Sequence, residues 1–330
     1  MASHIGRRKF LATLGGAAAW PLAARAQQPA KLVIGFLNIG SPDWNSVQVH
    51  EFRIGLSEAG FNDGQNVAIE FRWAQGHGDR LPALAGDLVE RRVAVIVATG
   101  GNTVTLAAKS ATASIPIVFT MGDDPVRLGI VSSVNRPGGN VTGASFYSGS
   151  LGPKRLELLR ELVPKVTSFA YLTHSLNPEA ESQLRDVQAA ANAMGQQLFL
   201  FDARSDNDIH SAYAAMAEKR VGALLLGSAA FLYERMNAIV ALAIRHAIPA
   251  CYYERQFVRA GGLMSYGARR SDAYRQAGIY AGRILKGEKP GDLPIIFPSR
   301  FELVFNLGIA KVIGVVVPPT LLARADEVIE

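Results

Sequence analysis

The sequence predicts an α/β fold made of two doubly wound, parallel-sheet lobes joined by a hinge, with a cleft between them. Short apolar runs alternate with segments of helical period along most of the chain. The same order of elements occurs twice, and 330 residues are more than one simple core requires. With 49% hydrophobic and 19% charged residues, the composition is that of a globular protein.

The first lobe is predicted from the alternation that begins after residue 30. Residues 32–37 form an apolar run typical of a strand, and residues 45–59 follow with helical spacing. In this helix we expect Val47, Phe52, Leu56 and Ala59 to share a buried face. The other elements expected here are strands 66–73, 93–98, 117–121 and 141–145, and helices 81–92 and 102–113. Strands that alternate with helices predict a parallel sheet covered on both faces.

The second lobe is predicted from the return of this order. Pro164 ends a helix over residues 156–162, and Gly195 ends a longer helix over residues 179–194. The further elements expected are helices 209–219 and 231–246, and strands 168–173, 198–201, 221–226 and 248–253.

Two matched segments indicate that the second half repeats the first. Residues 93–97 resemble residues 221–225, which lie 128 positions later, and both follow a predicted helix. The dipeptide Ile115-Pro116 recurs 133 positions later as Ile248-Pro249, and each copy lies at the start of a predicted strand. The sequence therefore predicts two similar lobes of about 120 residues each.

The first 26 residues have the pattern of an export signal. Arg7-Arg8-Lys9 is a charged start, residues 10–22 are apolar, and Ala24-Arg25-Ala26 is a cleavage site. The apolar stretch is shorter than the ~20 residues that span a bilayer. The paired arginines favour the twin-arginine route, with the general secretory route as the alternative. We expect cleavage near Ala26, a periplasmic location and no transmembrane helix.

Charge and cysteine content exclude several classes of protein. The net charge of +6 includes four basic residues of the leader, and their removal leaves +2. This near-neutral balance argues against a nucleic-acid partner. The single cysteine, Cys251, excludes an intramolecular disulfide and any cysteine-based metal cluster. Its apolar surroundings favour a buried strand residue over a reactive thiol.

Motifs of catalysis and cofactor binding were sought and not found. The sequence lacks a phosphate-binding loop, a dinucleotide fingerprint after the first strand, H-E-x-x-H and G-x-S-x-G. Its six histidines have no metal-ligand spacing. We therefore predict no catalytic residues, no metal and no cofactor, with an α/β enzyme of unrecognised motif as the alternative.

The ligand site is expected beyond the carboxyl ends of the strands, where helix N-termini gather. Gly100 and Gly101 open a predicted helix and could hold an anion, or form only a tight turn and cap. Asp123 and Asp124 could bind an ammonium group, or cap the following turn. Glu254 could contact the ligand, or form a hinge ion pair with Arg255.

Aromatic side chains near the same strand ends could form one wall of the site, although ordinary packing is the alternative for each of them. These aromatic residues are Trp44, Phe146, Tyr252 and Tyr266. The full set of predicted ligand-binding residues is Ser41, Asp43, Trp44, Thr99, Gly100, Gly101, Asp123, Asp124, Ser145, Asn177, Ser228 and Glu254.

Several motifs carry a resemblance to a known family. The run Arg-Pro-Gly-Gly-Asn-Val-Thr-Gly at residues 136–143 is the most specific of them. Others lie at residues 58–61, 64–67, 115–119, 124–126, 261–267 and 281–290. On these motifs, the chain from Ala30 onward resembles ABC transporter substrate-binding proteins of the tryptophan/tyrosine-type group, which have the type I periplasmic-binding fold.

The resemblance implies a site and a chain path. It implies that five residues lie at or near the cleft, namely Ser41, Thr99, Asp124, Ser145 and Asn177. It also implies that a helix at 272–286 folds back onto the first lobe, and that a strand within 295–306 crosses again. The lobes would then comprise residues 31–146 with 272–290, and 147–271 with 291–330. The tripeptide 121–123 and the dipeptide 227–228 depart from the family pattern at the cleft, so the ligand does not carry over.

These observations predict a monomeric solute-binding protein rather than an enzyme. It would capture a small organic solute, with an aromatic amino acid or aromatic acid as candidates, and deliver it to the permease and ATPase subunits of an ABC importer. A periplasmic subunit that presents its ligand to a signalling receptor is the alternative within binding proteins. A ligand-responsive repressor would need a helix-turn-helix where the export signal lies.

Overall fold

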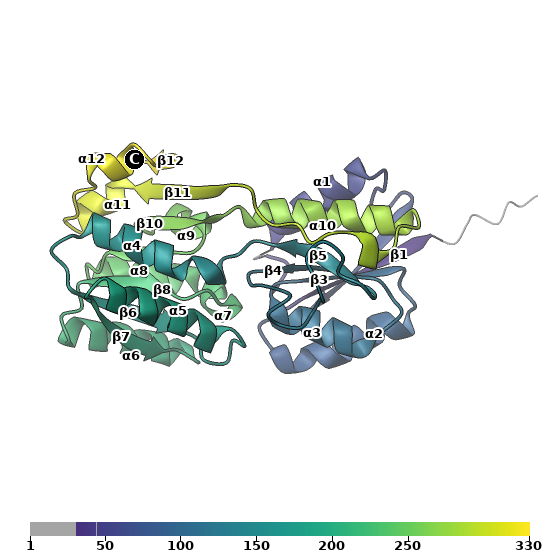
Figure 1. Ribbon diagram of the computed structural model, residues 1–330, viewed down its shortest axis with the longest axis horizontal. Helices are drawn as coiled ribbons and strands as arrows, with labels where there is room; N and C mark the ends of the chain where they lie inside the picture. Colours follow the sequence, from purple (N-terminus) through teal and green to yellow (C-terminus); the bar gives the residue numbers. More distant parts are fainter. Residues whose placement is uncertain (1–30, 44) are drawn as a thin grey trace, which may run out of the picture. The chain divides into compact units, whose positions relative to one another are not determined.

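The computed structural model describes residues 31–43 and 45–330, which form two α/β lobes (Figure 1). The first lobe is built on a five-stranded sheet in the order β2-β1-β3-β4-β5, and every neighbouring pair is parallel. Its strands are β1 (Leu32–Asn38), β2 (Val67–Trp73), β3 (Val95–Thr99), β4 (Ile117–Met121) and β5 (Val141–Ser145).

Helices cover both faces of this sheet, as Figure 1 shows. They are α1 (Ser46–Glu58) and α10 (Arg270–Leu285) on one face, and η1 (Gly78–Arg80), α2 (Leu81–Glu90) and α3 (Asn102–Ala111) on the other. Strand alternation divides the core between these faces. Ile34 and Phe36 pack with α1 and α10, whereas Leu37 packs with α2 and α3.

The second lobe repeats this plan and extends it. Its sheet has the order β12-β11-β10-β9-β8-β6-β7, in which the part from β7 to β10 matches the strand order of the first lobe. The strands are β6 (Ser168–Thr173), β7 (Gln197–Asp202), β8 (Ala223–Leu226), β9 (Ala250–Tyr252), β10 (Met264–Ala268), β11 (Phe301–Asn306) and β12 (Glu327–Ile329). Only the β10–β11 pair is antiparallel among the described strands of this sheet.

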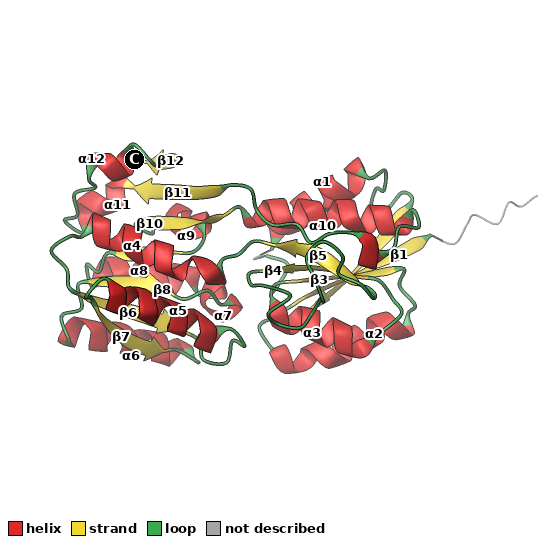
Figure 2. Ribbon diagram, viewed as in Figure 1, coloured by secondary structure: helices red, strands yellow, loops and turns green. Residues whose placement is uncertain are grey.

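Helices also cover this second sheet, and Figure 2 shows them around its strands. They are η2 (Gly149–Leu151), α4 (Gly152–Leu162), α5 (Ala180–Ala193), α6 (Asp206–Glu218), α7 (Ala230–Glu234), α8 (Met236–Arg245), α9 (Arg255–Arg259), α11 (Leu307–Val312) and α12 (Pro319–Leu322). The α/β fold of two parallel-sheet lobes predicted from the sequence is thus confirmed.

Three chain segments connect the lobes. The first leads from β5 to α4, the second from β10 to α10, and the third from α10 through η3 (Pro290–Asp292) to β11. On the third segment, Ile296 pairs with Ala144 of β5, and Leu293 and Ile295 lie in the core of the first lobe. The chain therefore belongs to the first lobe until shortly before β11 begins.

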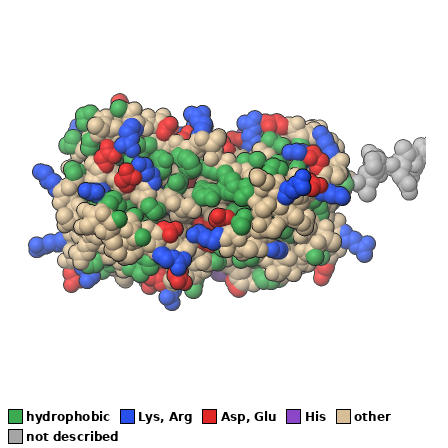
Figure 3. Space-filling model, in the orientation of Figure 1, with side chains coloured by type: hydrophobic (Ala, Val, Ile, Leu, Met, Phe, Trp, Pro, Cys, Tyr) green, Lys and Arg blue, Asp and Glu red, His purple; other side chains and the backbone are tan. Residues whose placement is uncertain are grey.

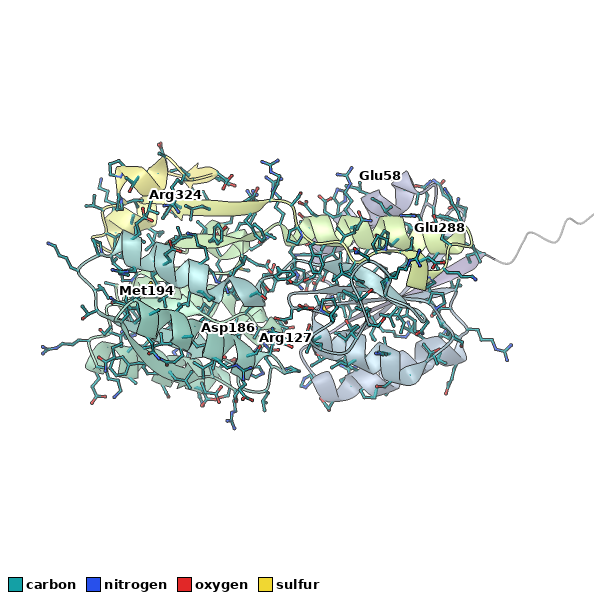
Figure 4. The ribbon with its side chains drawn as sticks, in the orientation of Figure 1. Glu58, Arg127, Asp186, Met194, Glu288 and Arg324 are labelled. Atoms are coloured by element: carbon teal, nitrogen blue, oxygen red, sulfur yellow. The ribbon has the colours of Figure 1, made fainter. Side chains whose placement is uncertain are left out.

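The contact between α1 and α10 depends on two glycines. A Cβ atom at Gly55 would lie 1.9 Å from the carbonyl oxygen of Arg275, and one at Gly278 would lie 2.1 Å from that of Phe52. At the exposed edge, Arg275 forms an ion pair with Glu58, which is labelled in Figure 4. The helix backbones approach so closely that only a hydrogen atom fits at either glycine.

Several predicted elements differ from the structure, and three of the helices show the physical reason. The helix predicted over residues 231–246 divides into α7 and α8 at Arg235, whose φ and ψ of −102° and 16° depart from helical values. Helix α4 begins at Gly152, before the predicted start, because Pro153 is tolerated in a first turn. Val47 is 55% exposed, and Val49 occupies the buried face instead. Val49 precedes Phe52 by three positions and shares its side of the helix.

None of the helices within residues 31–43 and 45–330 combines the length and the hydrophobicity that a membrane span requires. The predicted export signal, residues 1–26, lies outside the described residues. On the face drawn in Figure 3, acidic and basic side chains lie intermixed, so that face carries no large patch of one sign.

The glycine contact between α1 and α10 yields a prediction. We expect Gly55→Ala to lower the free energy of unfolding by about 3 kcal/mol, because the added methyl group overlaps the backbone of α10. The matched control is Gly86→Ala in the middle of α2, where a Cβ atom meets nothing within 4 Å. This control should stabilise the protein by about 0.5–1 kcal/mol through helix propensity. Urea unfolding measures both, and equal effects would contradict the role given to Gly55.

Candidate functional site

A small cavity lies between the lobes at the carboxyl ends of their strands. Its volume is about 70 Å³, and loops after β3, β4 and β5 face loops after β6, β8 and β9 across it. Its lining residues are Gly100, Gly101, Asn102, Thr103, Gly122, Asp123, Phe146, Ser148, Asn177, Ser228, Ala229, Ala230, Tyr233, Tyr253, Glu254 and Arg270. The two sheets thus point their ligand-binding ends at one space.

The N-terminus of α3 contributes backbone donors to this cavity. Gly100 and Gly101 have φ angles of +98° and +128°, a backbone conformation that other residues rarely adopt. Gly101 precedes the helix and gives it no side-chain cap, so the first N–H groups of α3 have no such partner. The adjoining Asn102 is buried, and its Oδ1 atom accepts no hydrogen bond among the described residues. The helix N-terminus favours an anionic or hydrogen-bond-accepting ligand group, whereas the Asn102 Oδ1 atom would accept a hydrogen bond from a ligand donor.

Asp123 places a buried carboxylate beside that helix start. Its side chain is 5% exposed, and its Oδ2 atom accepts a hydrogen bond of 2.7 Å from Asn102 Nδ2. Its Oδ1 atom has no partner among the described residues. Loss of hydration raises the pKa of Asp123 to about 6, and the nearby charge of Glu179 acts in the same direction. A donor or cation from outside the chain would complete this group.

Glu254 and Arg270 form a second, loosely paired charged group on the opposite side. The nearest nitrogen and oxygen atoms lie 3.6 Å apart, too far for a hydrogen bond. Both side chains are buried, and neither Glu254 oxygen nor Arg270 Nε has a hydrogen-bond partner among the described residues. Loss of hydration raises the pKa of Glu254. Both side chains can therefore still form hydrogen bonds with a ligand.

Aromatic rings surround the Arg270 guanidinium. Its central carbon lies 4.9 Å from the ring centroid of Tyr233, 5.4 Å from that of Phe146 and 5.6 Å from that of Tyr274. These distances are within the range of cation–π attraction, which is strongest in a desolvated setting. The rings hold the cation in place without neutralising it, so its charge remains available to a ligand.

A hydrogen-bonded network forms the floor of the cavity. Ser148, on the connection after β5, shares a hydrogen bond of 2.7 Å with Ser228. The Ser228 carbonyl oxygen accepts bonds from Asn177 and Gln183 of 2.9 and 3.1 Å. Buried Arg155 donates to the Ser148 carbonyl oxygen at 2.8 Å. These hydrogen bonds hold the segment from β5 to α4, which is the first of the three that connect the lobes, against the second lobe.

Two further contacts join the lobes beside the cavity. Arg127, which Figure 4 labels, reaches from the first lobe to Glu179 at 3.0 Å, and Glu179 is 3% exposed. Gln48 of α1 donates a hydrogen bond of 3.3 Å to the Tyr233 hydroxyl of the second lobe. These contacts are few and polar, as expected of surfaces that separate when lobes open.

Six of the twelve predicted site residues line the cavity. They are Gly100, Gly101, Asp123, Asn177, Ser228 and Glu254. They follow the ends of five different strands, β3, β4, β6, β8 and β9, and the parallel topology brings them together. Trp44, also predicted, lies outside the described residues.

The other five predicted residues do not line the cavity and have local structural partners. Thr99 accepts a hydrogen bond of 2.8 Å from Asn38 Nδ2, and Ser145 donates one of 2.9 Å to the Asp123 carbonyl oxygen. The Asp124 carboxylate accepts a hydrogen bond of 2.8 Å from the backbone N–H of Val126. It therefore caps the following turn, which is the predicted alternative to binding an ammonium group. Ser41 and Asp43 lie in the turn before α1, where their carbonyl oxygens accept from Asn45 and Ser46.

Sequence reasoning missed Arg270, Tyr233 and Tyr253, and it misassigned part of the aromatic wall. Phe146 lines the cavity, whereas Tyr252 stacks on Phe257 at 4.8 Å and Tyr266 on Phe301 at 6.1 Å. Tyr253, which directly follows β9, lines the cavity, although both tyrosine rings pack against Phe257. Arg270 lies two residues after the end of β10, and this position after a strand was a signal that could have identified it.

No group of three histidine, cysteine, aspartate or glutamate side chains in residues 31–43 and 45–330 is arranged to hold a metal ion. Cys251 lies fully buried in β9, and burial raises its pKa to about 12. A thiol of that pKa is inert at neutral pH, in agreement with the structural role predicted for it.

Comparison with known proteins decides the family. A model of the family described as ABC transporter substrate binding protein matches residues 38–329. The chain belongs to this family of ABC transporter substrate-binding proteins. The resemblance drawn from the sequence motifs is thereby confirmed, and membership of a binding-protein family supports the prediction that the chain is not an enzyme.

Individual relatives agree with this assignment. The chain is 26% identical to a tyrosine-binding protein of Clostridioides difficile over 251 residues, which cover 76% of this chain and 72% of the relative. A conserved domain protein of Vibrio cholerae superposes with a TM-score of 0.84 at 26% identity, covering 90% and 99% of the two chains. An ABC domain from Streptococcus pneumoniae in complex with L-Trp gives 0.82 at 26% identity, covering 91% and 100%.

The unpaired carboxylate of Asp123 yields a prediction on stability. A pKa of about 6 in the folded state, against 3.8 unfolded, stabilises the protein below pH 4, and this stabilisation is lost as the pH rises through 6. We therefore compare the free energy of unfolding of ligand-free Asp123→Asn with that of wild type at each pH. The value for the variant minus the value for wild type should be about 3 kcal/mol larger at pH 8 than at pH 4. Urea unfolding at several pH values measures this difference.

The neighbouring carboxyl group provides the matched control. Asp124→Asn removes an acid one position away that does not line the cavity, and its difference from wild type should lack the rise predicted for Asp123→Asn. A flat difference for Asp123→Asn over the same pH range would contradict the view that Asp123 is an unsatisfied buried acid.

Proposed function

We propose that this protein captures an aromatic amino acid between its lobes and delivers it to the permease of an ABC importer. The observation that carries the proposal is the set of incompletely partnered charges around one cavity. Asp123, Glu254 and Arg270 are buried, of both signs, and each has an atom without a hydrogen-bond partner among the described residues. An α-amino acid brings one ammonium and one carboxylate, and so complements such a set.

The arrangement of these charges suggests how the amino acid is held. The carboxylate would accept hydrogen bonds from the N-terminus of α3 and from Arg270, and the ammonium would lie near Asp123 and Glu254. Phe146, Tyr233 and Tyr253 supply aromatic surface on the same cavity, which favours a ligand with a flat apolar part. The tyrosine named for the Clostridioides relative and the L-Trp of the Streptococcus complex are ligands of this kind.

The two lobes provide the mechanism of capture. Their polar contacts beside the cavity are few, and three chain segments form the hinge between them. The solute would enter when the lobes separate, contact both, and shift the population toward the closed form. The closed form would then be recognised by the permease, whose ATPase subunits drive import. We infer that this happens in the periplasm, after residues 1–26 direct export and are removed, and that the protein acts as a monomer.

Ligand specificity tests the proposal. L-tryptophan and L-tyrosine should raise the unfolding midpoint, with about 2.7 kcal/mol of stabilisation at a hundredfold excess over Kd. Tryptamine, which lacks the carboxylate, and indole-3-propionate, which lacks the ammonium, should bind at least tenfold more weakly, because each leaves buried protein charges unpaired. Calorimetric titration of each compound gives the affinities.

Site variants give this test its control. Asp123→Asn should weaken amino-acid binding by about a hundredfold, as expected when one partner of a buried charge pair is removed. Asp124→Asn should leave the affinity unchanged, because its carboxyl group lies outside the cavity lining. Equal affinity for tryptophan, tryptamine and indole-3-propionate would overturn the amino-acid assignment.

A further inference from the structure

A second, larger cavity adjoins the charged one. Its volume is about 520 Å³, against about 70 Å³ for the charged cavity. The two cavities share four lining residues, which are Thr103, Asn177, Ala229 and Ala230. The smaller space is below the 300–1,000 Å³ of typical ligand pockets, whereas the larger one lies within that range. A solute with its charged groups in the first cavity would therefore extend its body into the second.

The walls of the second cavity include a stacked pair of aromatic rings. His174 and Phe231 stack with ring centroids 4.4 Å apart and ring planes 11° apart, and both line the space. The guanidinium carbon of Arg235 lies 3.7 Å from the Phe231 ring centroid, which holds that ring in place. The His174 ring is fixed in turn by a bond of 2.8 Å between its Nδ1 atom and the Ala203 carbonyl oxygen. Ile39, Leu176 and Pro178 add apolar surface, and polar or charged Gln75, His77, Asp79 and Arg204 also line the space.

Glu234 supplies one carboxylate to the same cavity. Its Oε1 atom is buried and has no hydrogen-bond partner among the described residues, and burial raises the pKa of the group. The carboxylate faces two glycines of the first lobe. A Cβ atom at Gly76 would lie 2.9 Å from Glu234 Oε2, and one at Gly40 would lie 3.3 Å from Oε1. The backbone of the first lobe thus approaches the carboxylate closely at Gly40 and Gly76, and the Oε1 atom remains without a hydrogen-bond partner among the described residues.

We propose that this second cavity is a subsite for the aromatic side chain of the solute, and that Glu234 accepts a hydrogen bond from a donor on that side chain. The inference rests on the proposed function, because the charged cavity must hold the amino-acid head group. The subsite adds selectivity among aromatic amino acids, which recognition of their common head group cannot provide. Among aromatic amino acids, the protein prefers those whose ring carries a hydroxyl or N–H group, because any other ring leaves the buried Oε1 atom of Glu234 without a hydrogen-bond partner, while Oε2 lies 3.8 Å from Arg235.

Three amino acids that share a head group test the subsite. Calorimetric titration with L-tyrosine, L-phenylalanine and 4-methoxy-L-phenylalanine compares a ring with a donor, a ring without one, and a ring whose oxygen only accepts. Wild type should bind tyrosine at least tenfold more tightly than the other two. Glu234→Gln should reduce this preference to about threefold or less through weaker tyrosine binding, with phenylalanine binding as well as before or better. Phe231→Ala should weaken all three by about tenfold.

Two controls separate the possible failures. Glu181→Gln, an exposed position in the first turn of α5, should leave all affinities unchanged, and thermal melts should show every variant folded. The three amino acids could bind wild type with affinities that fall in Asp123→Asn but do not change in Glu234→Gln or Phe231→Ala. In that case the subsite is wrong and the proposed function stands. If none of the three and no tryptophan binds wild type, the proposed function itself is wrong.

Discussion

The burial of charged groups that the chain does not fully pair is the constraint on which this account depends. Ionised side chains lose several kcal/mol of hydration when they are buried, and partners inside a protein normally offset this loss. Here Asp123, Glu254 and Arg270 surround one cavity, yet each retains an atom without a hydrogen-bond partner among the described residues. This arrangement does not stabilise the ligand-free fold. A ligand with charges of both signs would supply the missing hydrogen-bond partners.

The rest of the fold holds these groups at one place and lets the lobes move. Asp123 follows β4, Glu254 follows β9, and Arg270 begins α10, so each charge is fixed by an element of the core. Helix α10 belongs to the first lobe through its glycine contact with α1, although the strand before it belongs to the second lobe. Arg270 therefore lies at a point where the chain changes lobe, and its position depends on how the lobes are arranged.

The sequence was informative where periodicity and topology decide the outcome. Alternating strands and helices predicted both sheets, and the rule that ligands bind beyond parallel strands identified Asp123, Asn177 and Glu254. It was less informative between neighbouring residues such as Tyr252 and Tyr253, of which only Tyr253 lines the cavity although both rings pack against Phe257. Arg270 was missed because it begins a helix two residues after β10, although its position after a strand is a local signal.

The most direct test of the central claim counts the protons exchanged when an aromatic amino acid binds. Because the pKa of Asp123 is about 6 in the empty cavity, and an ammonium partner must lower it, binding at pH 5 should release close to one proton. Binding at pH 8 should release almost none through this group. Calorimetry in buffers of different ionisation enthalpy measures both numbers. Proton release that is the same at pH 5 and pH 8, or that persists in Asp123→Asn, would contradict the claim.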